Sequence, residues 1–229
     1  MKNKIIKYLL PLFLIAEVIL AILLHTTPPT NVYCYLSIIL ATLFCALLYQ
    51  PTKKWICTQG ALLFTLGADL FLVLLNTNKT LAMCLFSIAQ LFYATRLAFI
   101  QTKKELTVHF ITRGVVSAIA ILATVLVLGN KADALSIISL FYFANLIVNA
   151  IFATIKCKSE PLLCIGLWLF LFCDVFVGFS MLGGYLPLGN NAFLRFLASP
   201  PINMVWFFYL PSQVCLSLST LKKEQLLKK

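Results

Sequence analysis

Two aspartates lie inside long apolar runs of this chain, and their type and placement make them the first candidates for chemistry. Asp69 lies in the segment LGADLFL (66–72), and Asp174 lies 105 positions later in the similar segment LFCDVFV (171–177). An acid near the middle of a bilayer costs roughly 2.5–3.5 kcal/mol, so an intramembrane Asp indicates a functional site. Two such carboxyls without a nearby cation should share protons, which suits general acid catalysis or proton coupling.

The composition identifies the elements that must position these acids as membrane-spanning ones. The chain has 229 residues, of which 62% are hydrophobic and 11% charged, and its mean hydropathy is +0.99. A soluble domain of this size could not cover so much apolar surface. The net charge of +11 comes from short Lys and Arg clusters between apolar runs. These clusters are typical of topology signals, so no nucleic-acid partner is expected.

The apolar runs are continuous rather than alternating, which predicts helices and an all-α membrane protein in one integral domain, 1–229. Each run is close to the roughly 20 residues that a bilayer crossing needs. The eight predicted transmembrane helices are 5–24, 31–49, 55–75, 80–100, 106–128, 134–155, 161–182 and 201–221. A longer loop precedes the last of them. The first run lacks a small-x-small cleavage site, so it is predicted to remain uncleaved.

The distribution of basic residues supports this count through the positive-inside rule. With a cytoplasmic N-terminus, 15 of the 18 Lys and Arg residues fall on the inner side, the lysine-rich tail (222–229) included. Only Lys79, Lys131 and Arg195 fall on the other side. Both termini are therefore expected in the cytoplasm. The short loops and the lack of an organellar targeting segment favour a bacterial cytoplasmic membrane, with the endoplasmic reticulum as the alternative.

A weak internal repeat accompanies the two Asp segments. They coincide at a shift of 105 residues, and the Phe92-Tyr93 pair of the fourth run matches Phe208-Tyr209 of the eighth. Both of these runs end in Lys-Lys-Glu. Two four-helix halves in the same orientation would give this pattern. Chance matches among apolar helices are the alternative.

Other polar residues occur at helical spacing inside the runs. At 1.5 Å per residue, Glu17, Asp69 and Asp174 all lie roughly 9–12 Å below the outer boundary. Since lipid offers no hydrogen-bond partners, polar stripes should face the interior of the bundle. The stripe residues predicted as site members are Gln90 and Tyr93 in the fourth run, Asn145 and Asn149 in the sixth, and Tyr209 in the eighth. Purely structural interhelical hydrogen bonds are the alternative for each of them and for Glu17.

Arg96 and Arg113 are the only basic residues deep enough to meet these acids. Both lie near the predicted cytoplasmic helix ends, where they are expected to snorkel to the surface. The eight cysteines are scattered without a Cys-x-x-Cys motif, and only His25 and His109 are present. No metal site is therefore expected.

Taken together, these motifs resemble the YhhN-like lysoplasmalogenases over nearly the whole chain. The resemblance rests on eight short-looped helices, a Gly-x-Asp or Gly-Asp motif at Asp69, the aromatic-Tyr pair ending in Tyr93, and a small residue before Asp174. The chain departs from the expected pattern in having Ala68 between Gly67 and the first Asp, Cys173 in place of Ser, and Gln90 in place of His three residues before Tyr93.

The resemblance implies hydrolysis of the vinyl-ether bond of a lysophospholipid, without a metal or organic cofactor, releasing a fatty aldehyde and glycerophosphocholine or glycerophosphoethanolamine. Asp69 and Asp174 would divide the acid and base roles. The residues expected to position the substrate and water are Gln90, Tyr93, Asn145, Asn149, Tyr209 and Glu17. Two alternatives stay open, a small proton-coupled transporter or lipid flippase using the same carboxyls, and a non-catalytic lipid-binding or assembly protein. The sequence leaves the oligomeric state open.

Overall fold

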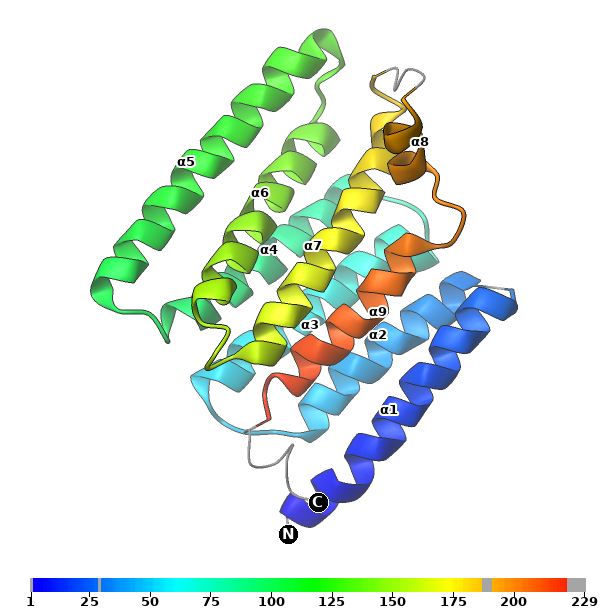
Figure 1. Ribbon diagram of the computed structural model, residues 1–229, viewed down its shortest axis with the longest axis vertical. Coiled ribbons are helices and arrows are strands. Elements are labelled where there is room, and N and C mark those ends of the chain that lie inside the picture. Colours follow the sequence, from blue (N-terminus) through cyan, green and yellow to red (C-terminus); the bar gives the residue numbers. More distant parts are fainter. Residues whose placement is uncertain (1, 29, 187–190, 222–229) are drawn as a thin grey trace.

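The structure is a computed structural model that describes residues 2–28, 30–186 and 191–221, without the side chains of 2–5 (Figure 1). The predicted lysine-rich tail, 222–229, lies outside the described residues. All regular elements in the described part are helical, as predicted from the continuous apolar runs. They are α1 (Lys2–Thr26), α2 (Thr30–Leu47), α3 (Lys53–Asp69), η1 (Leu70–Leu74), α4 (Lys79–Ala98), α5 (Lys103–Leu128), η2 (Gly129–Lys131), α6 (Ala134–Ile155), α7 (Pro161–Leu182), α8 (Ala192–Ala198) and α9 (Met204–Leu218).

Seven helical segments in the described chain are long and apolar enough to cross a membrane, and the first seven predicted spans correspond to them. The eighth predicted run, 201–221, forms α9, which has only 15 residues. The loop before it contains a helix that the sequence prediction omitted, α8, whose N-terminus is capped by the Asn191 side chain. Pro200 and Pro201 separate α8 from α9, because proline lacks the backbone N–H that a continuous helix needs.

Figure 1 shows a layered bundle in which α3, α4, α7 and α9 occupy the middle. α5 lies at one outer side against α6, and α1 lies at the opposite side against α2. The ends of α4 and α6 lie at the same end of the bundle as the starts of α3, α5 and α7. This lysine-rich end carries Lys53, Lys54, Lys103, Lys104, Lys156 and Lys158. The clustering predicted from the sequence is thus present in space.

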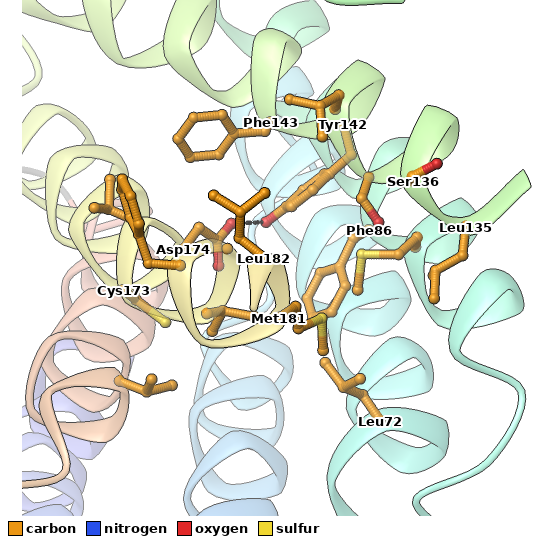
Figure 2. A pocket seen from close by; sticks show the side chains of 18 of the residues that line it. Leu72, Phe86, Leu135, Ser136, Tyr142, Phe143, Cys173, Asp174, Met181 and Leu182 are labelled. Carbon is orange, nitrogen blue, oxygen red and sulfur yellow. Dashed lines mark hydrogen bonds between the residues drawn. The ribbon is translucent and has the colours of Figure 1, made fainter. Parts of the chain in front are cut away.

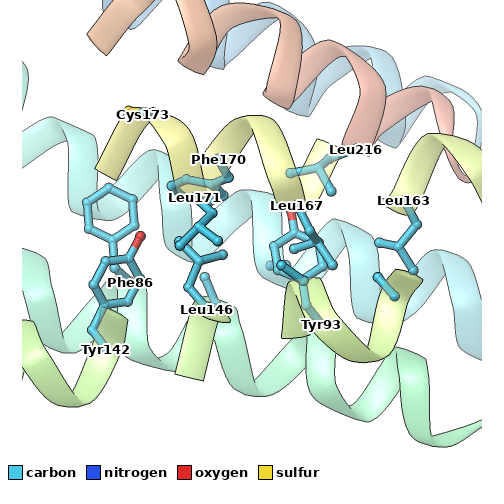
Figure 3. Close-up of a cluster of buried hydrophobic side chains, with 14 of the residues drawn as sticks. Phe86, Tyr93, Tyr142, Leu146, Leu163, Leu167, Phe170, Leu171, Cys173 and Leu216 are labelled. Carbon is cyan, nitrogen blue, oxygen red and sulfur yellow. The ribbon is translucent and has the colours of Figure 1, made fainter. Parts of the chain in front are cut away.

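The main buried cluster joins the central helices (Figure 3). Phe86 and Tyr93 of α4 and Leu167 of α7 are among its members, and all are buried. α7 and α9 approach closely at Gly166, where an added Cβ would lie 2.8 Å from Leu216 Cγ. The glycine therefore lets α7 and α9 pack closely together.

The expectation that Arg96 snorkels to the surface was wrong. Its side chain is 1% exposed and donates hydrogen bonds to Thr58 Oγ1 at 2.6 Å and to Ser219 Oγ at 2.6 Å. Glu160 Oε2 accepts a further bond from Arg96 at 2.9 Å, and Lys54 pairs with the same carboxylate. Partners on other helices replace water, so Arg96 fastens α3, α4, α7 and α9 together near the lysine-rich end.

Candidate active site

Asp69 and Asp174 line one cavity of about 400 Å³ inside the bundle. Its volume falls in the range typical of ligand pockets, and its wall is mostly apolar, also typical. The lining residues are Asp69, Leu72, Val73, Met83, Phe86, Leu128, Leu135, Ser136, Ser139, Leu140, Tyr142, Phe143, Cys173, Asp174, Val175, Val177, Gly178, Phe179, Met181, Leu182, Tyr185, Val205, Trp206 and Tyr209. No Lys or Arg belongs to this set. The tertiary structure therefore brings together the two acids that the sequence singled out.

Each carboxyl accepts a hydrogen bond from a tyrosine of another helix. The Tyr209 hydroxyl on α9 donates to Asp69 Oδ2 at 2.6 Å. The Tyr142 hydroxyl on α6 points at Asp174 and donates to its Oδ2 (Figure 2). Asp69 is 1% exposed, whereas Asp174 is half-buried. A tyrosine hydroxyl stabilises a carboxylate without neutralising its charge, so the pair keeps the capacity to exchange a proton.

The backbone changes its winding directly after Asp69. η1 is a π-helical turn, in which Leu75 N–H donates to Leu70 O at 2.9 Å. Asn76 and Asn78 follow with φ of 46° and 48°, left-handed values that Asn tolerates better than most residues and that end the helix. Such π-turns are frequent at functional sites, because one extra residue per turn rotates the side chains that follow. Here the turn begins directly after Asp69, the carboxyl in the cavity wall.

The cavity is partly open, and its lining includes exposed residues of both α6 and α7. Leu140 on α6 lines it and is 41% exposed, and Gly178 on α7 is also an exposed part of the lining. Figure 2 labels Phe143 of α6 and Leu182 of α7 near the Tyr142–Asp174 hydrogen bond. This surface consists of apolar side chains, so the opening faces the region that lipid chains would occupy.

Three of the predicted substrate contacts lie elsewhere, in a second polar cluster between α4, α5 and α6. Asn149 Nδ2 donates to Gln90 Oε1 at 2.9 Å. Arg113 donates to Asn145 Oδ1 and to Asn149 Oδ1, each at 2.5 Å. None of Gln90, Asn145 and Asn149 belongs to the cavity lining.

Arg113 is the centre of this cluster, and its predicted position at the membrane surface was also wrong, since it is 8% exposed. Its Nη2 lies 3.1 Å from His109 Nε2, and His109 Nδ1 lies 3.0 Å from Gln101 Oε1. A neutral His109 with its proton on Nδ1 satisfies both contacts. Among the described residues, Arg113 forms no ion pair with a carboxylate, so amide oxygens and an imidazole compensate its burial.

The other two predicted residues are also buried away from the cavity lining. Tyr93 is 0% exposed, and its hydroxyl has no partner in the described part of the chain. Glu17 accepts a 2.5 Å hydrogen bond from Ser37 Oγ, which joins α1 to α2. The internal repeat would pair Tyr93 with Asp174 as Tyr209 pairs with Asp69, but Tyr142 takes that place. Of the predicted substrate contacts, only Tyr209 lines the cavity.

The sequence argument did not include Tyr142, Trp206 and Cys173, three lining residues whose side chains could take part in binding or catalysis. Tyr142 lies one turn before Asn145 in the sixth predicted run, a spacing that is visible in the sequence, but it was not predicted as a site residue. Trp206, one turn before Tyr209 on α9, carried the same signal. Cys173 was noted only as a departure from a family pattern. Helical spacing puts residues on one face, but it does not tell which stretch of that face borders a cavity.

The fold and this site define a multi-pass α-helical membrane protein with two carboxyls in an apolar, laterally open cavity. The family model described as "YhhN family" matches residues 30–220. The chain belongs to the YhhN family, as its motifs predicted. No curated protein and no solved structure matches the chain.

Proposed function

We propose that this protein is a lysoplasmalogenase-like hydrolase that cleaves the vinyl-ether bond of a lysophospholipid inside the membrane. The observation that carries the proposal is the placement of Asp69 and Asp174 in one apolar cavity, each held by a tyrosine hydroxyl. Vinyl-ether hydrolysis needs a proton donor for an alkene carbon and an anion beside the resulting oxocarbenium ion. Paired carboxyls meet the same two requirements in glycosidases. Membership of the YhhN family supports the same reaction.

In the first step, the protonated carboxyl transfers its proton to the alkenyl carbon that lies one bond beyond the ether-bearing carbon. The π electrons form the new C–H bond, and the ether-bearing carbon becomes an oxocarbenium ion. We assign this proton to Asp69, because its side chain is almost fully excluded from solvent, where an ionised carboxyl is most costly. The ionised Asp174 stabilises the cation electrostatically.

In the second step, water adds to the oxocarbenium carbon and gives one proton to Asp174, forming a hemiacetal. Asp69, now ionised, takes the hemiacetal hydroxyl proton, while Asp174 protonates the departing glycerol oxygen. The carbon–oxygen bond breaks, and a fatty aldehyde and a glycerophospho alcohol leave. Both carboxyls return to their starting states, so the cycle consumes only water and needs no metal or cofactor.

The apolar wall would hold the alkenyl chain, which enters from the lipid phase between α6 and α7. Tyr209 and Tyr142 keep the two carboxyls at fixed positions, and this fixed geometry lowers the cost of orienting the reacting groups. Gln90, Asn145 and Asn149 act at a distance in this proposal. Their hydrogen bonds hold α4 and α5 to α6, the helix that carries Tyr142.

The proposal includes the orientation of the protein in its membrane. We propose that α9 is the eighth crossing despite its length, and that the lysine-rich end faces the cytoplasm of a bacterial inner membrane with both termini on that side. The carboxyls then lie in the half of the membrane away from the cytoplasm. Membrane lipids surround the protein, and no protein partner is required for the reaction.

The test measures aldehyde release by the purified, detergent-solubilised protein given lysoplasmalogen, with the matching ester lysolipid as the control substrate. We expect aldehyde from the vinyl ether and no fatty acid from the ester, because an ester carbonyl offers no alkene carbon to protonate. Folded protein that releases no aldehyde would refute the proposal. Proton-coupled transport through the same carboxyls would then be tested in proteoliposomes.

A further inference from the structure

The cavity ends in a charged rim at the end of the bundle opposite the lysine-rich end. The turn that joins α5 to α6, residues 129–133, is flanked by cavity-lining Leu128 and Leu135. Tyr185, just beyond α7, lines the cavity from the other side. The rim (Lys131, Asp133 and Tyr185) therefore borders the cavity where its apolar wall meets solvent or lipid head groups.

The rim holds one cation and one anion on opposite sides of a tyrosine. Lys131 Nζ donates to the Tyr185 backbone oxygen at 2.8 Å. The Tyr185 hydroxyl lies 3.2 Å from both carboxylate oxygens of Asp133. Lys131 is exposed, and within the described residues it has no carboxylate partner. The two opposite charges are thus near each other without neutralising each other directly.

Local hydrogen bonds fix the anion in place. Asp133 Oδ1 accepts from Ser136 N–H at 2.8 Å, and Ser136 Oγ accepts from Asp133 N–H at 3.0 Å, which is a capping box at the start of α6. The Ser136 backbone N–H holds the pKa of Asp133 below its usual range, so the carboxylate is ionised at neutral pH. Burial raises the pKa of Tyr185, which keeps its hydroxyl a donor.

We infer that this rim binds the zwitterionic phosphate–amine head group of the substrate. Lys131 binds the phosphate, and Asp133 binds the ammonium group. The inference rests on the proposed function and adds its head-group specificity. A lysine is a compact donor suited to phosphate, and a carboxylate next to an aromatic ring suits an ammonium group. Lys131 and Asp133 are specificity-determining residues outside the reacting centre.

The depth of the carboxyls agrees with this placement. Asp174 precedes Leu182 by eight residues, about 12 Å along the helix axis. Six covalent bonds separate the phosphorus atom of such a lipid from its ether-bearing alkenyl carbon, a reach of about 7 Å at the extension of two residues of backbone. The side chains of Lys131 and Tyr185 can cover the remaining distance. A head group on the rim thus places the vinyl ether beside Asp174.

The experiment compares three vinyl-ether substrates that differ only in the head group. The first carries phosphoethanolamine, the second carries phosphate alone, and the third, an alkenylglycerol, carries neither. For Lys131→Ala we expect KM to rise about fivefold for the two phosphate-bearing substrates, the upper range for an exposed ion pair, with kcat unchanged. KM for the alkenylglycerol should stay the same. For Asp133→Asn we expect a KM increase with phosphoethanolamine only, because Asn still caps the helix. High salt should reduce both effects.

Lys79→Ala is the matched control. Lys79 begins α4 at the same end of the bundle as the rim, but within the described chain it donates no hydrogen bond to a cavity-lining residue, whereas Lys131 donates to Tyr185. Equal KM changes for all three substrates would assign Lys131 a structural role and overturn the inference, as would no change at all. Binding of non-hydrolysable alkyl-ether analogues, followed by the fluorescence of cavity-lining Trp206, separates the two proposals. If the wild type releases no aldehyde, the proposed hydrolase function is refuted. The head-group inference is judged separately, by whether the Lys131 and Asp133 variants lose the wild type's discrimination between head groups in binding.

Discussion

Replacing each cavity carboxyl by its amide, Asp69→Asn and Asp174→Asn, tests the proposed chemistry most directly. In the Asp69→Asn variant, the amide oxygen can still accept the Tyr209 hydrogen bond that Asp69 Oδ2 now accepts at 2.6 Å, but the amide cannot transfer a proton. General acid–base catalysis contributes about 10²–10⁴ in rate, or about 2.7–5.4 kcal/mol. We therefore expect kcat to fall by about that factor in each variant.

Folding should survive these substitutions, because each keeps the size and one hydrogen-bond acceptor of the original side chain. A hydrogen bond to a charged group contributes about 1.5–3 kcal/mol and a neutral one about 1 kcal/mol, so the stability loss should not exceed about 2 kcal/mol. The double variant should be little slower than either single one, because groups that act as a unit are not additive. Aldehyde release gives kcat, and thermal unfolding in detergent gives stability.

Glu17→Gln is the matched control for the amide substitutions. Glu17 is also a buried carboxyl in a membrane helix, but its partner is Ser37 and it does not line the cavity. Its amide variant should keep the wild-type kcat. The reasoning fails if a folded Asp69→Asn or Asp174→Asn variant retains more than about a tenth of the wild-type rate, which is above the range for a lost acid or base.

Three further predictions concern stability. Glu160→Gln should lower the free energy of unfolding by about 3–5 kcal/mol, because it leaves Arg96 buried without its carboxylate; an unchanged melting temperature in detergent would contradict this. Gly166→Ala should lower the free energy of unfolding by about 1–3 kcal/mol, because its added Cβ clashes with α9. Gly114→Ala is the control: it has no neighbour within 4 Å and should be neutral or stabilise α5 by up to about 1 kcal/mol. Equal melting temperatures for the two variants would refute the close-packing argument. The pKa of Asp133 is lower in the folded than in the unfolded state. The ionised side chain therefore contributes to stability above about pH 4, and this contribution is lost as the pH falls below that. Melting temperatures measured over a range of pH should show this loss in the wild type but not in Asp133→Asn.

Much of the helical architecture follows from the sequence, because the bilayer demands about 20 apolar residues per crossing and leaves few other solutions. The predicted bounds of α6 and α7, 134–155 and 161–182, are those of the structure. The prediction was poorer where the chain leaves the apolar pattern. α8 is only seven residues long, too short for a periodicity argument, and the shortening of α9 depends on two prolines and the Asn203 cap.

The sequence predicted the two carboxyls of the candidate site but not the residues that contact them. An acid inside an apolar run is visible in the sequence because its charge is costly there, and this cost identified Asp69 and Asp174 without any coordinates. The sequence also placed them at a similar depth, since helical rise converts residue number into distance. Their hydrogen-bond partners, Tyr209 and Tyr142, could not be assigned, because helical periodicity gives a face but not the neighbour that this face meets.

Only the tertiary structure decided how the remaining polar residues are shared out. Asn145 and Tyr142 follow one stripe of α6, yet Asn145 faces Arg113 on α5 while Tyr142 faces Asp174 on α7. Arg96, too, is buried because side chains of other helices receive its hydrogen bonds. The sequence by itself determined which residues are too polar for lipid. The packing of the helices determined which of them satisfy one another and which border the cavity, because these contacts join residues far apart in the chain.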